Sequence, residues 1–381
     1  MAKSKVGLKV PSKNEIIKKY GSIIKLASET KDCNLWLPSK FLALNYTMGG
    51  GIPFGKVLEV AGEESSGKSL IAYDFAYSTQ QLGGHVIWVD AEQSWMNSWA
   101  ETNGVDPSRV TVINDTRIEN IADMVADLAL YLRSQLVNNE PILLVVDSVA
   151  AMDCADNIDS KMVEAKAEMG GRAKALYKYF RIRNELFYRL GITQIYINQL
   201  RTALNVGFGK DNTTTTGGAA LKFYASIRLA FYSGKTITIK QNGKERKAGK
   251  LVTIRTIKNK VAPPRPTISK CPVYFNPKFH EVGFDRCFFL DDVLIDSNVL
   301  DKSSGGVYKY KGSTLCRGEE KLQKLLEEDD TLRRKLLKKA GINTIGSVKK
   351  QLEALGENYF PVEGVEYESY NDYDEEEESD E

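Results

Sequence analysis

The sequence predicts an α/β fold with a mostly parallel central sheet, extended by antiparallel strands and accompanied by an N-terminal helix and a small α-rich C-terminal domain. Short apolar runs alternate with amphipathic stretches along the middle of the chain, as in strands joined by crossover helices. Several of these runs end on a polar residue. One run is followed by a glycine-rich segment and then by a helical pattern, which is typical of a phosphate-binding turn.

The N-terminal helix is expected within residues 14–27, NEIIKKYGSIIKLA, where apolar residues recur at helical spacing. The stripe consists of Ile16, Ile17, Tyr20, Ile23, Ile24 and Ala27. It could pack on its own domain or dock onto a neighbouring copy, and the sequence leaves both open. We expect residues 1–34 to form an oligomerisation helix and a linker.

Five apolar runs predict the parallel strands of a core domain at residues 35–280. They lie at residues 57–61, 86–90, 110–113, 142–147 and 192–198. An open parallel sheet binds ligands at the carboxyl ends of its strands, so the polar residues there are expected to collect beside the glycine-rich segment. These residues are Asp90, Glu92, Asp147, Asn198 and Gln199.

The rest of the chain predicts an antiparallel extension and a second small domain. Residues 226–232, 235–245 and 250–258 alternate like strands, with a turn signal at Asn242-Gly243. Segments 319–328, 331–341 and 344–356 have helical patterns within a domain expected at 281–360. Residues 361–381 are expected to be a disordered acidic tail.

Charge is strongly segregated along the 381 residues. The net charge is +2, but residues 366–381 carry ten acidic and no basic groups, which leaves 2 + 10 = +12 on residues 1–365. Such a basic body attracts polyanions. The tail is either a solvated solubility segment or a competitor for the body's own nucleic-acid surface.

Other compositional features limit the classes of protein. Five scattered cysteines without a C-x-x-C pair argue against a disulfide framework, and two histidines leave no His-based zinc site. No apolar run reaches the roughly 18 residues that span a bilayer. We expect a soluble intracellular protein without a membrane partner.

Residues 62–69, GEESSGKS, match the phosphate-loop pattern G-x-x-x-x-G-K-[ST] at every fixed position. Glycines let the backbone curl so that N–H groups face a triphosphate, while Lys68 meets the β/γ phosphates and Ser69 a magnesium ion. A surface turn is the plain alternative, but a strand precedes the motif and a helix follows it. The expected nucleotide-binding residues are Gly62, Glu63, Glu64, Ser65, Ser66, Gly67, Lys68, Ser69 and Leu70.

Two carboxylates complete the expected ATPase chemistry. Asp147 ends an apolar strand, which is the usual form of the motif that orders Mg²⁺ and its waters. Glu92 follows the neighbouring strand, where it could act as general base for a water that attacks the γ-phosphate. A cap on the next helix is the alternative role for Glu92.

Two glycine-rich segments are candidate DNA-binding loops. Residues 198–218 leave a strand and become rich in Gly, Thr and Asn, and they carry Arg201 among many backbone amides suited to phosphates. Residues 156–171 end at Met169-Gly170-Gly171, followed by Arg172. By itself the second signal is weak.

The ordered set of motifs resembles the RecA recombinases from residue 35 to about residue 280. It includes GGGIPFGKVLEVAGEESSGKS, VDAE, VVDSVAAM, INQLR, TTTTGGAALKFYAS and the KNK at 258–260. The length and acidic tail are also similar to phage relatives of the UvsX kind. The resemblance implies a RecA-like P-loop ATPase core that uses ATP and Mg²⁺, in the cytoplasm of a bacterial or phage-infected cell.

The resemblance also implies partners and residue roles. The partners are single-stranded DNA, double-stranded DNA and further copies in a helical filament, with single-strand-binding or loading proteins as further candidates. Glu92 matches the family's catalytic glutamate and Gln199 its γ-phosphate sensor, with Lys68 as the third catalytic residue. Lys258 and Lys260 match the pair that reaches a neighbour's ATP.

The same alignment implies DNA contacts and shows departures from the family. Met169 and Leu204 fall where the family inserts apolar side chains between base triplets, and Phe208 falls at a subunit contact. The other implied DNA contacts are Gly170, Gly171, Arg172, Arg201, Thr216, Gly217 and Gly218. Met96 and Trp99 replace an aspartate and a tyrosine around the adenine, and Trp99 could still stack on the base.

A ring-forming motor of the same superfamily, such as a helicase, and a non-hydrolysing DNA-binding paralogue are the alternatives. The KNK and TTTTGGAALKFYAS segments favour strand exchange over the ring motor. Intact Lys68, Glu92 and Asp147 argue against a protein without turnover.

Overall fold

The computed structural model describes residues 12–20, 35–136, 140–159, 170–202 and 213–355. The chain divides into two units, Met1–Asn34 and Leu35–Glu381. In the first, α1 (Lys13–Tyr20) begins with a capping box: the Ser12 N–H donates to the Glu15 carboxylate (2.8 Å) and the Glu15 N–H donates to Ser12 Oγ (3.3 Å). The helix predicted over 14–27 is described only to Tyr20, and the rest of it lies outside the described residues.

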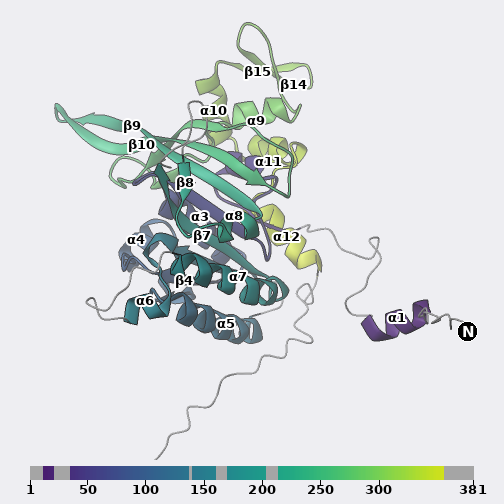
Figure 1. Ribbon diagram of the computed structural model, residues 1–381. Coiled ribbons are helices and arrows are strands. Elements are labelled where there is room, and N and C mark those ends of the chain that lie inside the picture. Colours follow the sequence, from purple (N-terminus) through teal and green to yellow (C-terminus); the bar gives the residue numbers. More distant parts are fainter. Residues whose placement is uncertain (1–11, 21–34, 137–139, 160–169, 203–212, 356–381) are drawn as a thin grey trace, which may run out of the picture. The chain divides into compact units, whose positions relative to one another are not determined.

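A ten-stranded mixed sheet forms the centre of the second unit, in the order β12-β11-β10-β9-β3-β7-β6-β4-β5, with β8 paired to β7 (Figure 1). The six neighbours from β9 to β5 run parallel, and the other pairings are antiparallel. The predicted fold class is therefore confirmed. The strands are β3 (Val57–Gly62), β4 (His85–Asp90), β5 (Val110–Ile113), β6 (Ile142–Asp147), β7 (Ile192–Thr202), β8 (Thr213–Thr215), β9 (Ile227–Gln241), β10 (Lys244–Asn259), β11 (Ile268–Tyr274) and β12 (Gly283–Phe284).

Helices cover both faces of the parallel part because its strands are apolar on both sides. On one face, Leu58 and Val60 share a hydrophobic cluster with Phe75 of α3; on the other, Val57 clusters with Leu176 of α7. A short β1 (Trp36–Leu37) and β2 (Ile52–Pro53) pair separately. The helices of the core are α2 (Leu42–Met48), α3 (Lys68–Gln81), α4 (Asn97–Thr102), α5 (Ile118–Gln135), α6 (Ala155–Asp159), α7 (Gly171–Arg189) and α8 (Ala220–Tyr224).

Strands β9 and β10 continue beyond the core as a long projecting hairpin (Figure 1). Segments 226–232 and 235–245 were predicted separately, but β9 runs unbroken from Ile227 to Gln241. Asn242 (φ 51°) and Gly243 (φ 75°) make the predicted turn. The hairpin extends beyond the pairing of β9 with β3, which stops at Phe231.

The C-terminal part contains the three predicted helices and a small sheet that the sequence patterns did not reveal. Its helices are α9 (Leu290–Asp296), α10 (Glu319–Glu328), α11 (Asp330–Lys339) and α12 (Ile345–Leu355), and its strands are β13 (Asp301–Lys302), β14 (Val307–Tyr310) and β15 (Ser313–Arg317). Leu322 and Leu336 join the same hydrophobic cluster as Leu37 and Phe75. A domain boundary at 280 stays a prediction. None of the helices in the described ranges is both long and apolar enough to cross a bilayer.

Asn45 of α2 ties the C-terminal part to the core. Its buried amide accepts from the Ser39 N–H (2.7 Å) and donates to the Ser39 carbonyl (2.8 Å) and the Asn343 carbonyl (3.0 Å). Asn343 in turn donates to the Gly50 carbonyl (3.2 Å). The two parts are therefore joined by polar as well as apolar contacts.

We expect Asn45→Ala to lower the free energy of unfolding by about 1–3 kcal/mol, because it leaves buried backbone groups without partners. Chemical denaturation of the full chain measures the change. The control, Gln241→Ala in the exposed hairpin, should stay within about 0.5 kcal/mol of the parent. An Asn45→Ala protein as stable as this control would contradict the expectation.

Candidate functional site

The loop between β3 and α3 is shaped as a phosphate cradle. At Gly62 an added Cβ would lie 2.6 Å from Ser66 Oγ and 2.8 Å from the Phe231 carbonyl oxygen, so a side chain cannot fit without displacement. Gly67 (φ 88°) turns the chain into α3 through a conformation that favours glycine. The first N–H groups of the 14-residue α3 therefore lie at the loop, where they favour an anion.

Other residues of the motif hold the loop in place. The Glu63 carboxylate accepts from the Ser233 N–H (2.9 Å), which fixes the loop to β9. Ser66 Oγ donates to the Glu63 carbonyl (2.8 Å). Glu64 and Ser65 are exposed, and Leu70 packs against the core.

Lys68 reaches back over the loop, where its Nζ donates to the Glu63 carbonyl (2.6 Å). Burial lowers the pKa of Lys68, and the nearby Asp147 and Glu92 carboxylates oppose this shift. The ammonium therefore lies between the loop and two acids. It can exchange its carbonyl acceptor for a phosphate oxygen.

Ser69 and Asp147 meet at the start of α3 and the end of β6, where Ser69 Oγ donates to the Asp147 carboxylate at 2.8 Å. Burial raises the pKa of Asp147 to about 6; Ser69 opposes the shift, and Glu92 and Asp90 add to it. Hydroxyl and carboxylate oxygens are ligands that Mg²⁺ accepts. Within the described ranges no three Asp, Glu, His or Cys side chains form a metal site alone, so phosphates and water would supply the remaining ligands.

Glu92 lies just beyond β4 with its carboxylate exposed, and it accepts a hydrogen bond from Ser148 Oγ. Asp90 has a different role, because its carboxylate accepts hydrogen bonds from the N–H groups of Ser94 (3.0 Å) and Trp95 (2.8 Å) and caps the turn after β4.

The sequence analysis did not identify Ser148 as the partner of Glu92. Its position directly after Asp147 was the available signal.

Gln199 and Asn198 lie on β7 next to the phosphate loop, because Gly62 pairs with Gln199 and Ala61 with Asn198. Gln199 is half-buried, whereas Asn198 is fully buried. The structure thus brings all five polar strand-end residues to the edge of the sheet that carries the phosphate loop.

Trp99 of α4 is half-buried and packs against the core cluster that contains Ala100 and Val105. Met96 precedes α4 and is 58% exposed. Trp95 instead approaches the phosphate-loop helix, since its ring lies 5.6 Å from that of Tyr73 on α3. Among the described residues, we find no contact between Trp99 and Lys68 or the partners of Lys68.

Lys258 and Lys260 lie at the end of β10 rather than around Lys68. Lys258 Nζ donates to the carbonyls of Lys222 (2.7 Å) and Phe223 (3.1 Å) in α8, and the Lys260 N–H donates to the Ser226 carbonyl (3.0 Å). The Lys258 ammonium and the Lys260 N–H thus bind carbonyls of α8 and of Ser226 just beyond it. Nothing in the described ranges places them at the phosphate loop of their own chain.

Glycines of the two candidate DNA loops line one open hollow of about 290 Å³. Its lining comprises Asp153, Asn157, Gly170, Gly171, Arg172, Ala173, Gly217 and Gly218. Arg172 donates to the Ala150 carbonyl (3.1 Å) and pairs with Asp153 (3.5 Å), so its guanidinium already has partners. Gly217 has a φ of 85°, which favours glycine, and an added Cβ would lie 2.7 Å from a methyl group of Leu176. Thr216 precedes this pair and contacts Asn198.

Several sequence-predicted contacts fall outside the described residues. Met169, Leu204 and Phe208 lie in segments 160–169 and 203–212. Arg201 is described only through its backbone in β7. Their roles stay predictions.

Comparison with known proteins places this arrangement in a family. The family profile described as the RecA N-terminal domain matches residues 11–276. Protein RecA of Saccharopolyspora erythraea is 31% identical over 335 residues, covering 86% of this chain and 91% of the relative. Protein RecA of Picosynechococcus sp. is 32% identical over 319 residues (83% and 86%), and that of Trichodesmium erythraeum 33% over 318 (84% and 82%). Because the profile matches more than half of the chain and the alignments cover 82–91% of these relatives, the chain belongs to the RecA family of recombinases.

Proposed function

We propose that this chain is a DNA-dependent ATPase that forms helical filaments on single-stranded DNA and pairs and exchanges homologous strands. The observation that carries the proposal is the sharing of β7 by two sites. Its end pairs with the phosphate loop at Gly62, and the same end leads into the glycine-rich segment that returns at Thr216. Both sites therefore depend on β7, and a ligand bound at one site can affect the other through this strand.

We further propose distinct roles for the residues around the phosphate loop. Lys68 and the amides of α3 bind the phosphates of ATP, and Ser69 and Asp147 hold Mg²⁺. When bound, Mg²⁺ would neutralise negative charge on the phosphates. Glu92, oriented by Ser148, removes a proton from the attacking water, and Gln199 senses the γ-phosphate.

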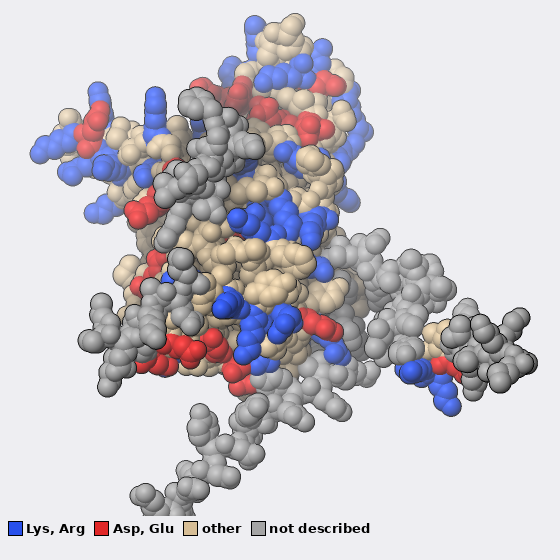
Figure 2. Space-filling model, in the orientation of Figure 1, with Lys and Arg blue, Asp and Glu red and all other residues tan. Residues whose placement is uncertain are grey.

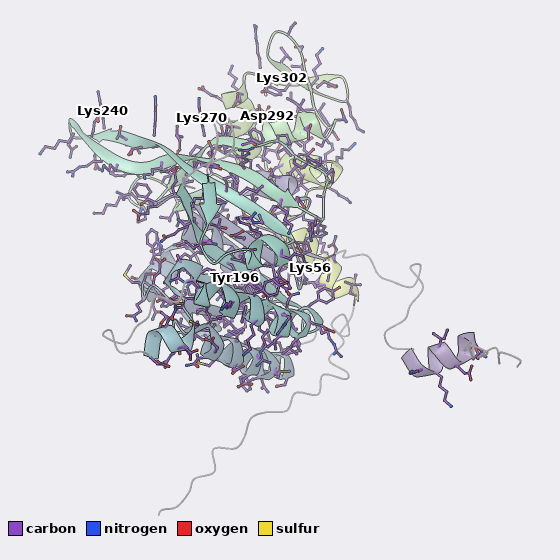
Figure 3. All side chains as sticks on the ribbon, in the orientation of Figure 1. Lys56, Tyr196, Lys240, Lys270, Asp292 and Lys302 are labelled. Atoms are coloured by element: carbon purple, nitrogen blue, oxygen red, sulfur yellow. The ribbon has the colours of Figure 1, made fainter. Side chains whose placement is uncertain are left out.

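Charge on the β9–β10 hairpin supports a nucleic-acid partner. Residues 235–247 hold five basic residues and a single acidic one, Glu245, and the basic residues are exposed. Figure 2 shows lysine and arginine side chains crowding this projecting end, where Figure 3 labels Lys240. Surfaces of this kind bind phosphate backbones without reading sequence.

Electron microscopy with single-stranded DNA and a slowly hydrolysed ATP analogue tests the filament. We expect extended helical filaments, because an ATP site shared between copies makes a head-to-tail contact. Closed rings as the only assembly would instead support a ring-forming motor.

Glu92→Gln should bind ATP normally while DNA-stimulated turnover falls by about 100-fold or more, since the amide cannot accept the water's proton. Steady-state phosphate release and nucleotide-binding titrations separate the two effects. Glu101→Gln, an exposed glutamate on α4, is the matched control and should retain full turnover. Normal turnover in Glu92→Gln would remove this residue from the mechanism.

Mixing two inactive variants tests whether Lys258 and Lys260 act on a neighbouring copy. Glu92→Gln keeps both lysines, and Lys258→Ala/Lys260→Ala keeps Glu92, so a mixed filament contains some complete interfaces. An equimolar random polymer should have complete sites at about one quarter of its interfaces and regain turnover that neither variant shows alone. No recovery, with co-assembly verified by cross-linking, would contradict a shared site.

A further inference from the structure

Glu59 is a carboxylate buried in the centre of the sheet. It lies in β3 between the apolar residues Leu58 and Val60, and its exposed fraction is 0%. Removing a charge from water is costly, and well-packed apolar residues often replace a buried ion pair with no loss of stability. The position therefore needs an explanation beyond stability, and the partners of Glu59 provide one.

The first partner is Asn198, whose side-chain amide joins the two ends of the glycine-rich segment. Asn198 Nδ2 donates to Glu59 Oε1 (2.9 Å) and to the Thr216 carbonyl (3.0 Å). Its Oδ1 accepts from the Gln199 N–H (2.9 Å) and from Thr216 Oγ1. Every hydrogen-bonding group of this amide is used, so Asn198 can adopt one orientation only.

The second partner is Arg228 of β9, whose Nε donates to the other carboxylate oxygen of Glu59. Arg228 faces Lys258 across the β9–β10 ladder. Burial, with Lys260 and Arg228, lowers the pKa of Lys258, and Glu59 opposes this shift. One carboxylate thus contacts the root of the glycine-rich segment and balances the cations around Lys258.

We propose that Glu59 is a positioning residue that couples the ends of the glycine-rich segment, at Asn198 and Thr216, to Arg228 and Lys258. DNA bound at the segment then affects the contact of Lys258 with a neighbour's nucleotide, and the nucleotide contact affects DNA binding. The inference rests on the proposed function, in which the segment binds DNA and Lys258 serves a neighbour's ATP. Movement of Thr216 or Gln199 reorients the Asn198 amide, which shifts the carboxylate and the guanidinium that it holds. Tyr196, the register partner of Glu59 on β7, marks this region in Figure 3.

The experiment measures the ratio of ATP turnover with and without saturating single-stranded DNA in the full chain. Glu59→Gln keeps the volume of the side chain but replaces one carboxylate oxygen with an NH2 group, so either Asn198 Nδ2 or Arg228 Nε faces a donor instead of an acceptor. We expect the ratio to fall by about tenfold, the effect of losing one charge-assisted hydrogen bond, with the KM for ATP within about twofold of the parent. A role confined to stability would lower the melting temperature and leave the ratio unchanged.

A second pair of variants keeps the inference falsifiable if Glu59→Gln does not fold. Thr216→Val removes the hydroxyl that donates to Asn198, and Thr216→Ser retains it. We expect the ratio to fall in the valine variant and to be rescued in the serine variant. Thr193→Val is the matched control, because Thr193 is a buried threonine on β7 whose hydroxyl accepts from the Gly55 N–H (3.3 Å) outside this network.

The outcomes separate the inference from the proposed function. A parent protein whose turnover ignores DNA would overturn the proposed function and this inference with it. If DNA stimulates the parent, and the Glu59 and Thr216 variants keep its ratio within twofold, only the coupling is wrong. A fall in Thr193→Val equal to that in Thr216→Val would also overturn it, because any lost hydrogen bond on β7 would then have the same effect.

Discussion

The parallel pairing of β3 with β7 on one side and β9 on the other is the constraint on which the site depends. This register aligns Gly62 with Gln199 and with Phe231, so the start of the phosphate loop lies beside Gln199 on one side and beside the strand that continues into the hairpin on the other. A slip of one strand by one residue would place Asn198 and Glu59 on opposite faces of the sheet. The geometry of the ATP site and that of the glycine-rich segment are therefore set by the same hydrogen bonds.

Electrostatics at this edge explain why the site suits a magnesium nucleotide. Asp147, Asp90 and Glu92 lie near one another, and burial together with their mutual repulsion raises the pKa of Asp147. In the proposed function, a divalent cation held beside Ser69 would relieve that repulsion, and Lys68 and the amides of α3 would bind the accompanying phosphates. The fold therefore already holds in place the groups that such a ligand needs.

The sequence could predict the parts of this site that depend on local patterns. Apolar runs located β3, β4, β6 and β7, and the last three end on a polar residue. The phosphate loop requires glycine at Gly62 because of close contacts and at Gly67 because of its positive φ. Ser148 was missed as the partner of Glu92 because its position after Asp147 was the only signal and the contact joins two strands. The sheet of β13 to β15 was missed because its strands are short. Glu59 did leave a signal, a charge within VLEVA, but its partners come from β7 and β9, far along the chain.

The contacts of Lys258 suggest how neighbouring copies could communicate. Its ammonium caps the last carbonyls of α8, the short helix that follows Gly217 and Gly218. To meet a phosphate on another copy, Lys258 must release those carbonyls, and α8 then loses a cation that favours its C-terminal end. In the proposed shared site, that loss makes the new phosphate contact less favourable, so a ligand that moves α8 would change the affinity of Lys258 for the neighbouring nucleotide. Linkage requires the converse, that nucleotide bound next door changes the affinity of the glycine-rich segment for its own ligand.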